Sequence, residues 1–186
     1  MGRLIYSAIA SLDGFVADVE GNFDWSMPDD AVHRFVNDML RPVQLHLYGR
    51  RMYEVLVAWE DPAMDNEAED YVREFAQLWR AADKVVYSRT LQEPSSARTR
   101  IERSFDANTV RDLVAASSGD VLIAGPEIAA LAFEAGLVDE YRTLVSPVAV
   151  GSGKRALPND RALEFELHNE QRFANGVVYL EYGVVR

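Results

Sequence analysis

Two arginines follow a glycine at the end of an apolar run in the segment "LYGRRMYE", residues 47–54. Arg50 and Arg51 stand where a buried strand is expected to turn into a helix. Guanidinium groups bind phosphate-like anions through paired hydrogen bonds, so this turn is a candidate anion site. The alternative is ordinary surface charge, because the acids Glu54, Glu60 and Asp61 follow closely. The local sequence is compatible with both interpretations.

Two further strand ends carry groups that suit a phosphate. Ser88 and Arg89 follow the apolar run "KVVY", and Gly125 follows "DVLIA" and precedes a helix that starts at Pro126 or Glu127. The free amides of a helix N-terminus bind anions, and a glycine lets a ligand approach the backbone closely. Each of these turns by itself is also a common strand–helix connection. Because ligands of open α/β sheets bind at the carboxyl ends of strands, the three turns together predict one extended anion site.

Candidate proton chemistry lies in the segment "DWSMPDD", residues 24–30. A carboxyl group beside an aromatic side chain can relay a proton to a reacting molecule. Here Trp25 lies close in sequence to Asp29 and Asp30. The alternative is capping of the helix that follows, a role that accounts for one of these two acids.

The composition excludes several classes of site. The chain has 186 residues, no cysteine, and a formal net charge of −11. It therefore has no disulfide and no thiolate metal site, and a non-specific nucleic-acid binder is not expected from so acidic a chain. The three histidines show no metal-ligand spacing, so we expect no metal. The apolar run near the N-terminus is too short for a signal peptide or a membrane span, which predicts a cytoplasmic protein without a membrane partner.

The expected elements alternate between strands and helices and then end in strands. Apolar runs at residues 4–10, 43–49, 84–88, 120–125 and 139–151 predict buried strands, and helical spacing is found at residues 28–40, 67–82, 106–119 and 126–136. Residues 162–173 and 176–186 predict an antiparallel hairpin around Asn175–Gly176. This order predicts an α/β protein with a mixed, mainly parallel central sheet between helices, in a single domain over residues 1–186.

The segment "GSGKRA", residues 151–156, matches the glycine spacing of a dinucleotide-binding turn. That turn requires a helix to begin there, and Leu157–Pro158 disfavours one. We therefore expect a backbone bend near a ligand or an interface.

Taken in order, the motifs resemble those of a known family. The segments "SLDGFVA", "GNFDW", "LYGRRMYE", "VVYSRTL", "IAGPEIAALAFEAGLVDEY" and "SPVAVGSGK" are similar to the dihydrofolate-reductase-like family, specifically to relatives of the C-terminal reductase domain of bifunctional riboflavin biosynthesis enzymes. The resemblance runs from Leu4 to the last strand. It implies a three-layer α/β/α fold, a homodimer, and reduction of a small heterocyclic substrate by NADPH, as in 5-amino-6-(5-phosphoribosylamino)uracil reductase or dihydrofolate reductase.

The resemblance also assigns residues. The nicotinamide end of NADPH would lie near Ile9, Ala10 and Gly14, and Ser88 and Arg89 would lie near its 2′-phosphate. Trp25, Asp30 and Phe35 would line the substrate pocket, with Asp30 as the proton relay. The other phosphates would lie against two turns, made of Gly49, Arg50, Arg51 and Met52 and of Gly125, Pro126, Glu127, Ile128 and Ala129.

Two departures from the family pattern keep a second hypothesis open. Met52 replaces the usual threonine, and "EDPAMDN", residues 60–66, lacks the arginine that would bind a substrate phosphate. The alternative is a nucleotide-binding protein of the same fold that has no turnover.

Overall fold

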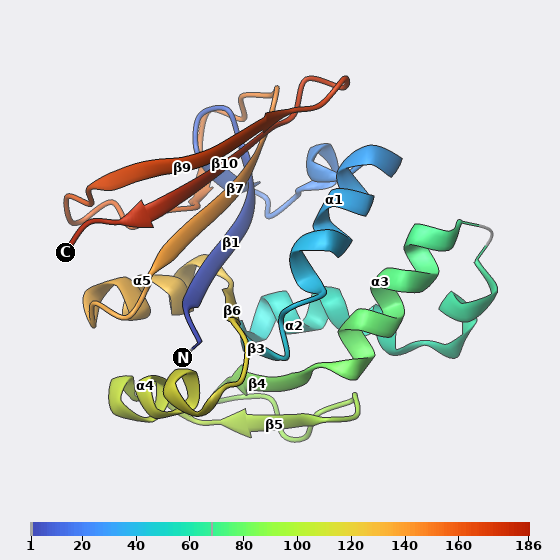
Figure 1. Ribbon diagram of the computed structural model, residues 1–186, viewed down its shortest axis with the longest axis vertical. Coiled ribbons are helices and arrows are strands. Elements are labelled where there is room, and N and C mark those ends of the chain that lie inside the picture. Colours follow the sequence, from blue (N-terminus) through green and yellow to red (C-terminus); the bar gives the residue numbers. More distant parts are fainter. Residues whose placement is uncertain (1, 68) are drawn as a thin grey trace.

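A single twisted sheet organises the computed structural model, which describes residues 2–67 and 69–186 (Figure 1). The sheet has eight strands. In spatial order they are β5 (Thr99–Glu102), β4 (Asp83–Tyr87), β3 (Leu45–Gly49), β6 (Val121–Ala124), β1 (Leu4–Ser11), β7 (Glu140–Ser146), β10 (Val178–Val184) and β9 (Phe165–Arg172).

The six strands from β5 to β7 in this order run parallel to one another. The strand β10 pairs antiparallel with both β7 and β9, so β9 and β10 form a hairpin at the edge of the sheet. The predicted mixed, mainly parallel sheet with a C-terminal antiparallel hairpin is therefore confirmed.

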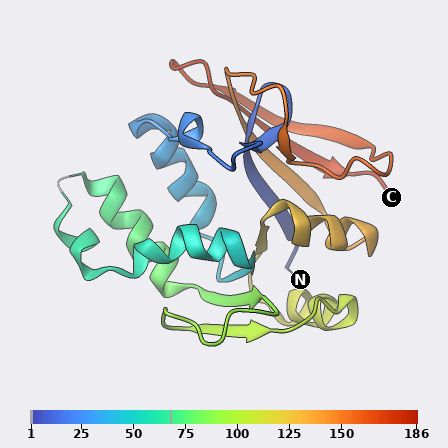
Figure 2. The ribbon, with the colours of Figure 1, turned by 180° about the vertical axis from the view of Figure 1, so that it is seen from behind.

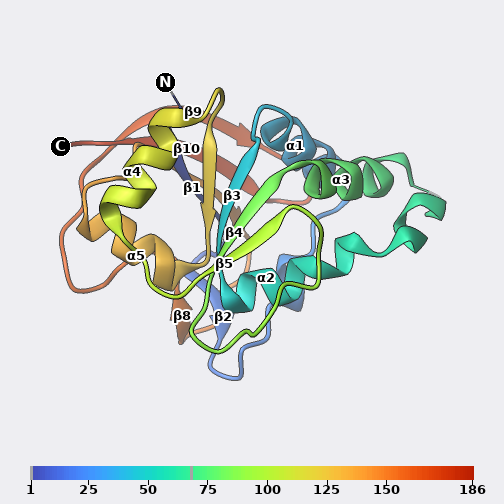
Figure 3. The ribbon, with the colours of Figure 1, turned by 90° about the horizontal axis from the view of Figure 1, so that it is seen from below.

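Helices cover both faces of the sheet, as the view from below shows (Figure 3). One face carries α4 and α5, and the other carries α1 and α3. The helices are α1 (Asp30–Leu40), α2 (Arg50–Leu56), α3 (Asp70–Ala81), α4 (Ala107–Ala116) and α5 (Pro126–Glu134), with short 3₁₀ turns η1 (Asp24–Ser26), η2 (Val57–Glu60) and η3 (Pro62–Asn66). None of the helices in the described residues is long and apolar enough to cross a membrane.

The central strands are apolar throughout because side chains on both faces are buried. In β1, Leu4 and Tyr6 pack in the cluster beneath α4 and α5. Ile5 and Ile9 face the opposite side and pack beneath α1. The continuous apolar run that predicted this strand is the consequence of that double coverage.

The connections from two adjacent strands leave the sheet on opposite faces. The strands β3 and β6 are neighbours. The helix α2 follows β3 and places Tyr53 in the same apolar cluster as Phe75 and Trp79 of α3, whereas α5 follows β6 and packs beneath the other face. In Figure 2 the beginning of α5 lies next to α2. Such a switch in topology opens a crevice at the carboxyl ends of the strands.

The structure corrects the extent of one predicted strand. The strand expected over residues 139–151 ends at Ser146, before Pro147. The bend at residues 151–156 forms no helix, as expected, and part of it becomes β8 (Gly153–Arg155). This strand pairs with β2 (Phe15–Asp18), which the sequence did not indicate, to make a small two-stranded ribbon. Because these short strands form only by pairing between distant segments, the local sequence of each segment does not indicate a strand.

Candidate functional site

A large cleft runs across the carboxyl ends of β1, β3, β4 and β6, with a volume of about 1540 Å³. The three predicted strand-end turns all lie in its wall, so the expectation that they share one site agrees with their placement. The predicted residues that line the cleft are Ile9, Gly49, Arg50, Arg51, Met52, Ser88, Arg89, Gly125, Pro126, Glu127 and Ile128.

Two glycines bring the turns after β3 and β6 close together. Gly125 has φ of 109°, a conformation that side chains rarely adopt. A Cβ atom built on Gly125 would lie 3.5 Å from the amide nitrogen of Gly49 and 3.7 Å from Cβ of Met52. No side chain caps α5, so the amides of Glu127 and Ile128 in its first turn have no intrahelical acceptor, and both residues line the cleft. The amide of Ala129 already donates to the carbonyl of Gly125.

The paired arginines at the start of α2 have different surroundings. Arg50 donates to Glu54 at 2.8 Å, as the surface-charge interpretation expected. Arg51 makes no hydrogen bond or ion pair with any described residue, and it lines the cleft. Arg51 is therefore a cation available to a ligand, whereas Arg50 already has a carboxylate partner.

The turn after β4 presents a second unpaired arginine. Ser88 Oγ accepts the backbone N–H of Leu91 at 2.9 Å, which leaves the Ser88 hydroxyl hydrogen free to donate elsewhere. Arg89 is exposed and has no partner in residues 2–67 or 69–186. Arg103 holds the turn in place by donating to the carbonyl oxygens of Ser88, at 3.1 Å, and Leu91.

Arg103 and Lys154 line the cleft, although the sequence did not single them out. Lys154 lies in the ribbon and forms an ion pair with Glu127. The hydrogen bond from Lys154 is the largest cause that lowers the pKa of Glu127, and the charges of Arg51 and Arg50 lower it further. Among the lining residues the bases outnumber the acids, in a chain whose net charge is −11. The bases are Arg50, Arg51, Arg89, Arg103 and Lys154, and the acids are Asp18, Glu20 and Glu127.

The ribbon of β2 and β8 forms one wall of the cleft. Gly153 has φ of 149°, and a Cβ atom there would lie 2.0 Å from the carbonyl oxygen of Ala17. Asp13 braces the adjoining turns by accepting the N–H of Gly151 at 2.7 Å and the hydroxyl of Ser11 at 2.6 Å. The Ser11 bond is the largest cause that lowers the pKa of Asp13. Gly14, at φ of 87°, belongs to this turn and does not line the cleft.

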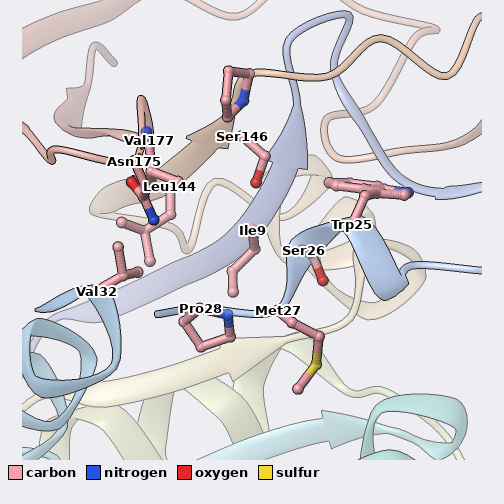
Figure 4. A pocket seen from close by; sticks show the side chains of 11 residues that line it. Ile9, Trp25, Ser26, Met27, Pro28, Val32, Leu144, Ser146, Asn175 and Val177 are labelled. Atoms are coloured by element: carbon pink, nitrogen blue, oxygen red, sulfur yellow. Dashed lines mark hydrogen bonds between the residues drawn. The ribbon is translucent and has the colours of Figure 1, made fainter. Parts of the chain in front are cut away.

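A second, smaller pocket of about 200 Å³ adjoins the β1 end of the cleft. The two cavities share Ile9, Ser26, Met27 and Pro28. Figure 4 shows the side chains around the small pocket, which come from β1, η1, α1, β7 and the β9–β10 hairpin. Its lining consists of Ile9, Trp25, Ser26, Met27, Pro28, Val32, Leu144, Ser146, Pro147, Asn175 and Val177.

Of the residues predicted to line the substrate pocket, Trp25 lines this cavity, whereas Phe35 and Asp30 do not. Trp25 lines it, and the indole nitrogen of Trp25 is buried without a partner among the described residues. Phe35 lies behind it, with its ring centroid 5.3 Å from that of Phe173 and 4.6 Å from that of Tyr179. Ala10 and Ala129 are buried and line neither cavity.

The two acids at the start of α1 have separate roles. Asp29 is the N-cap, and its carboxylate accepts the N–H of Val32 at 3.0 Å. Asp30 is the first helical residue, and its Oδ1 accepts the hydroxyl of Tyr71 at 2.8 Å. Asp30 lines neither cavity. Capping therefore accounts for Asp29 and leaves the predicted role of Asp30 open.

One group of potential metal ligands lies outside both cavities. Glu140, His168 and Glu181 approach one another on β7, β9 and β10. Glu140 already forms ion pairs with Arg3 and Arg142. The positive charge of these arginines opposes a bound cation, so we assign no metal to this group.

Comparison with known proteins finds a matching family and a relative of similar length. A family model described as the RibD C-terminal domain matches residues 3–179. The uncharacterized protein YyaP of Bacillus subtilis (strain 168) is 28% identical over 182 residues, which are 97% of this chain and 94% of that protein.

Solved structures share the fold at low sequence identity. A candidate riboflavin biosynthesis protein from Shewanella sp. PV-4 superposes with a TM-score of 0.75 and 19% identity, over 99% of both chains. The diaminohydroxyphosphoribosylaminopyrimidine deaminase/5-amino-6-(5-phosphoribosylamino)uracil reductase of Thermotoga maritima gives a TM-score of 0.68 and 15% identity. That match covers 99% of this chain and 57% of the Thermotoga chain.

Proposed function

The chain belongs to the RibD C-terminal domain family, and we propose from this membership and the two adjoining cavities that it is an NADPH-dependent reductase of a small heterocyclic substrate. The observation that carries the proposal is the position of Arg51 and Arg89. Both are cations without a partner among the described residues, and both line the same cleft as the open amides of α5. Such an arrangement suits a ligand with several separated phosphates.

The three turns would each hold one part of the cofactor. The amides of Glu127 and Ile128 would bind the pyrophosphate, which Gly125 lets approach the backbone. Gly49 and Met52 would border it, and Arg50 and Arg51 would supply charge. Ser88 and Arg89 would bind the 2′-phosphate through a hydroxyl and a guanidinium donor. Ala129 would contribute by packing α5 onto the sheet, because its side chain is buried.

The substrate would lie in the small pocket, beside the β1 end of the cleft. NADPH, if bound in the cleft, would supply a hydride from its nicotinamide ring. Ile9 borders both cavities, so it would contact both the nicotinamide and the substrate. Ala10 and Gly14 would support this end from behind Ile9 and from the turn that follows β1. Trp25 would limit the pocket on one side.

Reduction also requires a proton, and we propose Asp30 as its source. Asp30 lines neither cavity, so the proton would have to pass through water near Pro28, which lines both cavities and precedes Asp30 by two residues. Asp30 Oδ1 is held by Tyr71, and Oδ2 has no described partner. Phe35 would keep α1 in place, since it packs in the same apolar cluster as Val32, Leu144 and Val177 of the pocket wall.

The family suggests two reactions to test first. The Thermotoga relative is described as a 5-amino-6-(5-phosphoribosylamino)uracil reductase, and dihydrofolate reduction is the other candidate. A homodimer and a cytoplasmic location remain predictions.

The test is a fluorescence titration of the full chain with NADPH and with NADH, followed by an assay of NADPH oxidation with both candidate substrates and with smaller heterocycles. We expect saturable binding that favours NADPH. Absence of saturable NADPH binding, or equal affinity for the two cofactors, would contradict the proposal. Binding without oxidation of NADPH by any substrate would favour the nucleotide-binding alternative.

A further inference from the structure

We propose that the small pocket selects an uncharged, unphosphorylated substrate that presents hydrogen-bond acceptors to Ser146 and Asn175. This inference rests on the proposed function, because it assigns the substrate class of the same site. It distinguishes this chain from a reductase of phosphoribosylated substrates, the activity by which its Thermotoga relative is described.

The lining of the small pocket carries no charge. Among its 11 described lining residues there is no lysine, arginine, histidine, aspartate or glutamate. The adjoining cleft differs sharply, since Arg51 and Arg89 lie there without partners. An anionic group taken into the small pocket would lose its hydration without gaining a counter-charge. The pocket therefore disfavours phosphate and carboxylate groups.

Ser146 and Asn175 contribute polar side chains to the lining of the small pocket. Figure 4 shows the Ser146 hydroxyl and the Asn175 amide directed toward the space between Ile9 and Val32. Ser146 is only 4% exposed, and no hydrogen bond of its hydroxyl is found in the described part of the chain. It can donate to an acceptor on a bound molecule.

The orientation of the Asn175 amide follows from the hairpin turn. Its Oδ1 accepts the backbone N–H of Val177 at 3.0 Å, so Nδ2 is the atom left to face the pocket. Nδ2 is a donor only. Asn175 and Ser146 thus offer donors to a carbonyl oxygen or a ring nitrogen, and the remaining wall is largely apolar, through Ile9, Leu144 and Val177.

Residues 60–66, the segment that lacks the arginine expected to bind a substrate phosphate, lie outside the small pocket. Residues 60–66 form η3 and the turn before it, and this segment contacts α3. Asp65 pairs with Arg80 of α3, and Asp61 caps η3. None of these residues lines the small pocket.

The size of the pocket points to the same class of substrate. Its volume of about 200 Å³ is below the roughly 300–1,000 Å³ of sites for drug-sized ligands. A single planar ring system suits this space better than a ring that carries a phosphorylated sugar.

The test compares matched pairs of probes by calorimetric titration of the full chain, both free and saturated with NADP⁺. One pair is 5-amino-6-(5-phosphoribosylamino)uracil and its dephosphorylated ribosylamino counterpart. The other is 7,8-dihydrofolate, which carries carboxylates, and 6-methyl-7,8-dihydropterin, which does not. We expect the uncharged member of each pair to bind at least about 10-fold more tightly, a difference of about 1.4 kcal/mol.

Two asparagine variants provide a matched test of the pocket itself. Asn175→Asp keeps an oxygen to accept the N–H of Val177 but replaces the Nδ2 donor with an anionic oxygen. It should weaken binding of 6-methyl-7,8-dihydropterin at least about 10-fold and leave NADPH affinity unchanged. Asn169→Asp is the control, since Asn169 also accepts a backbone N–H, at 2.9 Å, but lies on exposed β9 outside the pocket. It should bind the probe as the unchanged chain does.

Three results would overturn the inference. The first is equal or tighter binding of the charged member of either pair. The second is failure of both uncharged members to bind with a dissociation constant below about 1 mM. The third is equal probe affinity in Asn175→Asp and Asn169→Asp. A separate NADPH titration identifies failure of the proposed function, because the probe comparison on the free chain does not depend on cofactor binding.

Discussion

Arg51 and Arg89 show that the availability of an arginine for an anionic ligand depends on whether an acidic neighbour already pairs with it. Adjacent Arg50 donates to Glu54, and an exposed pair of this kind contributes little to stability. Arg51 and Arg89 have no such partner among the described residues, although the chain contains 30 acidic residues against 19 lysines and arginines. At the residue scale, unpaired arginines in an acidic protein are the strongest sign of an anionic ligand.

Substitution of Arg89 by alanine should remove the preference for NADPH over NADH. The loss of charged hydrogen bonds to the 2′-phosphate should weaken NADPH binding by roughly 10- to 100-fold and leave NADH binding nearly unchanged. Fluorescence titration with both cofactors measures the effect. Arg100→Ala is the control, because Arg100 pairs with Glu102 on β5 and does not line the cleft. An Arg89→Ala variant that still discriminates between the cofactors would place the 2′-phosphate elsewhere.

Substitution of Asp30 by asparagine tests the proposed proton source. Turnover should fall by roughly 100-fold or more, while the dissociation constant for NADPH stays the same. The matched control is Asp29→Asn, one position earlier, since asparagine is also a good N-cap. Steady-state kinetics together with cofactor titration separate the two effects. Full activity in Asp30→Asn would restrict Asp30 to its contact with Tyr71.

At the scale of elements, the ribbon of β2 and β8 holds one wall of the cleft. The two strands are short, and their pairing contains a register shift between Phe15 and Ala17. Their positions depend on Gly153, which lies against the backbone of Ala17, and on Asp13, which bonds to the amide of Gly151. The ribbon therefore depends on a few close backbone contacts rather than on a long ladder of hydrogen bonds.

The variant Gly153→Ala should destabilise the protein by about 2 kcal/mol or more, because the new Cβ atom would collide with the Ala17 carbonyl. Gly136→Ala is a matched control. Gly136 also has positive φ, at 62°, but a Cβ atom there would meet nothing within 4 Å. It should cost only about 1 kcal/mol, from backbone strain. Urea unfolding measures both values, and equal losses would show that the Gly153 contact is relieved by a small shift of the ribbon.

At the scale of the whole molecule, coverage of both sheet faces buries titratable groups in the central strands. His46 of β3 is 2% exposed, and burial, assisted by the charge of Lys84, lowers its pKa from 6.5 to about 3. Burial also raises the pKa of Tyr48, whose hydroxyl is hydrogen-bonded to Nδ1 of His46 at 2.6 Å. The folded protein therefore keeps His46 neutral where the unfolded chain protonates it.

Stability should consequently decrease as the pH falls below about 6.5. Between the unfolded value of 6.5 and the folded value of about 3, the unfolded chain binds a proton at His46 that the folded protein does not. This difference contributes a slope of up to about 1.4 kcal/mol per pH unit. His33, whose pKa burial also lowers, adds in the same direction.

Urea unfolding at pH 5, 6 and 7 measures this dependence. His46→Gln should have a smaller slope than the unchanged chain, with the contribution of His33 remaining. Identical slopes in the unchanged chain and in His46→Gln would contradict the assignment to His46.

Much of the architecture could be predicted because its signals are local. Burial on both faces makes Leu4–Ser11 and Val121–Ala124 apolar throughout, and Pro126 after Gly125 marks the start of a helix. The family motifs occur at these same strand ends, so the turns of the cleft were recognisable as well. The ribbon of β2 and β8 was missed because its pairing joins segments more than a hundred residues apart.

The amino-acid sequence by itself determined seven of the eight strands of the sheet, the helices and the three turns that point to a phosphate-bearing cofactor. Propensity, apolar spacing and glycine placement act over short stretches of chain, whereas the edge strand β5 was not predicted. Only the tertiary structure decided which side chains are free to act. It paired Arg50 with Glu54 and left Arg51 open, assigned the cap to Asp29 rather than Asp30, and brought Lys154 and Arg103 into the cleft. It also joined Ser146 and Asn175 around an uncharged pocket. Partners and cavities depend on distances between residues far apart in the chain, and no local pattern encodes them.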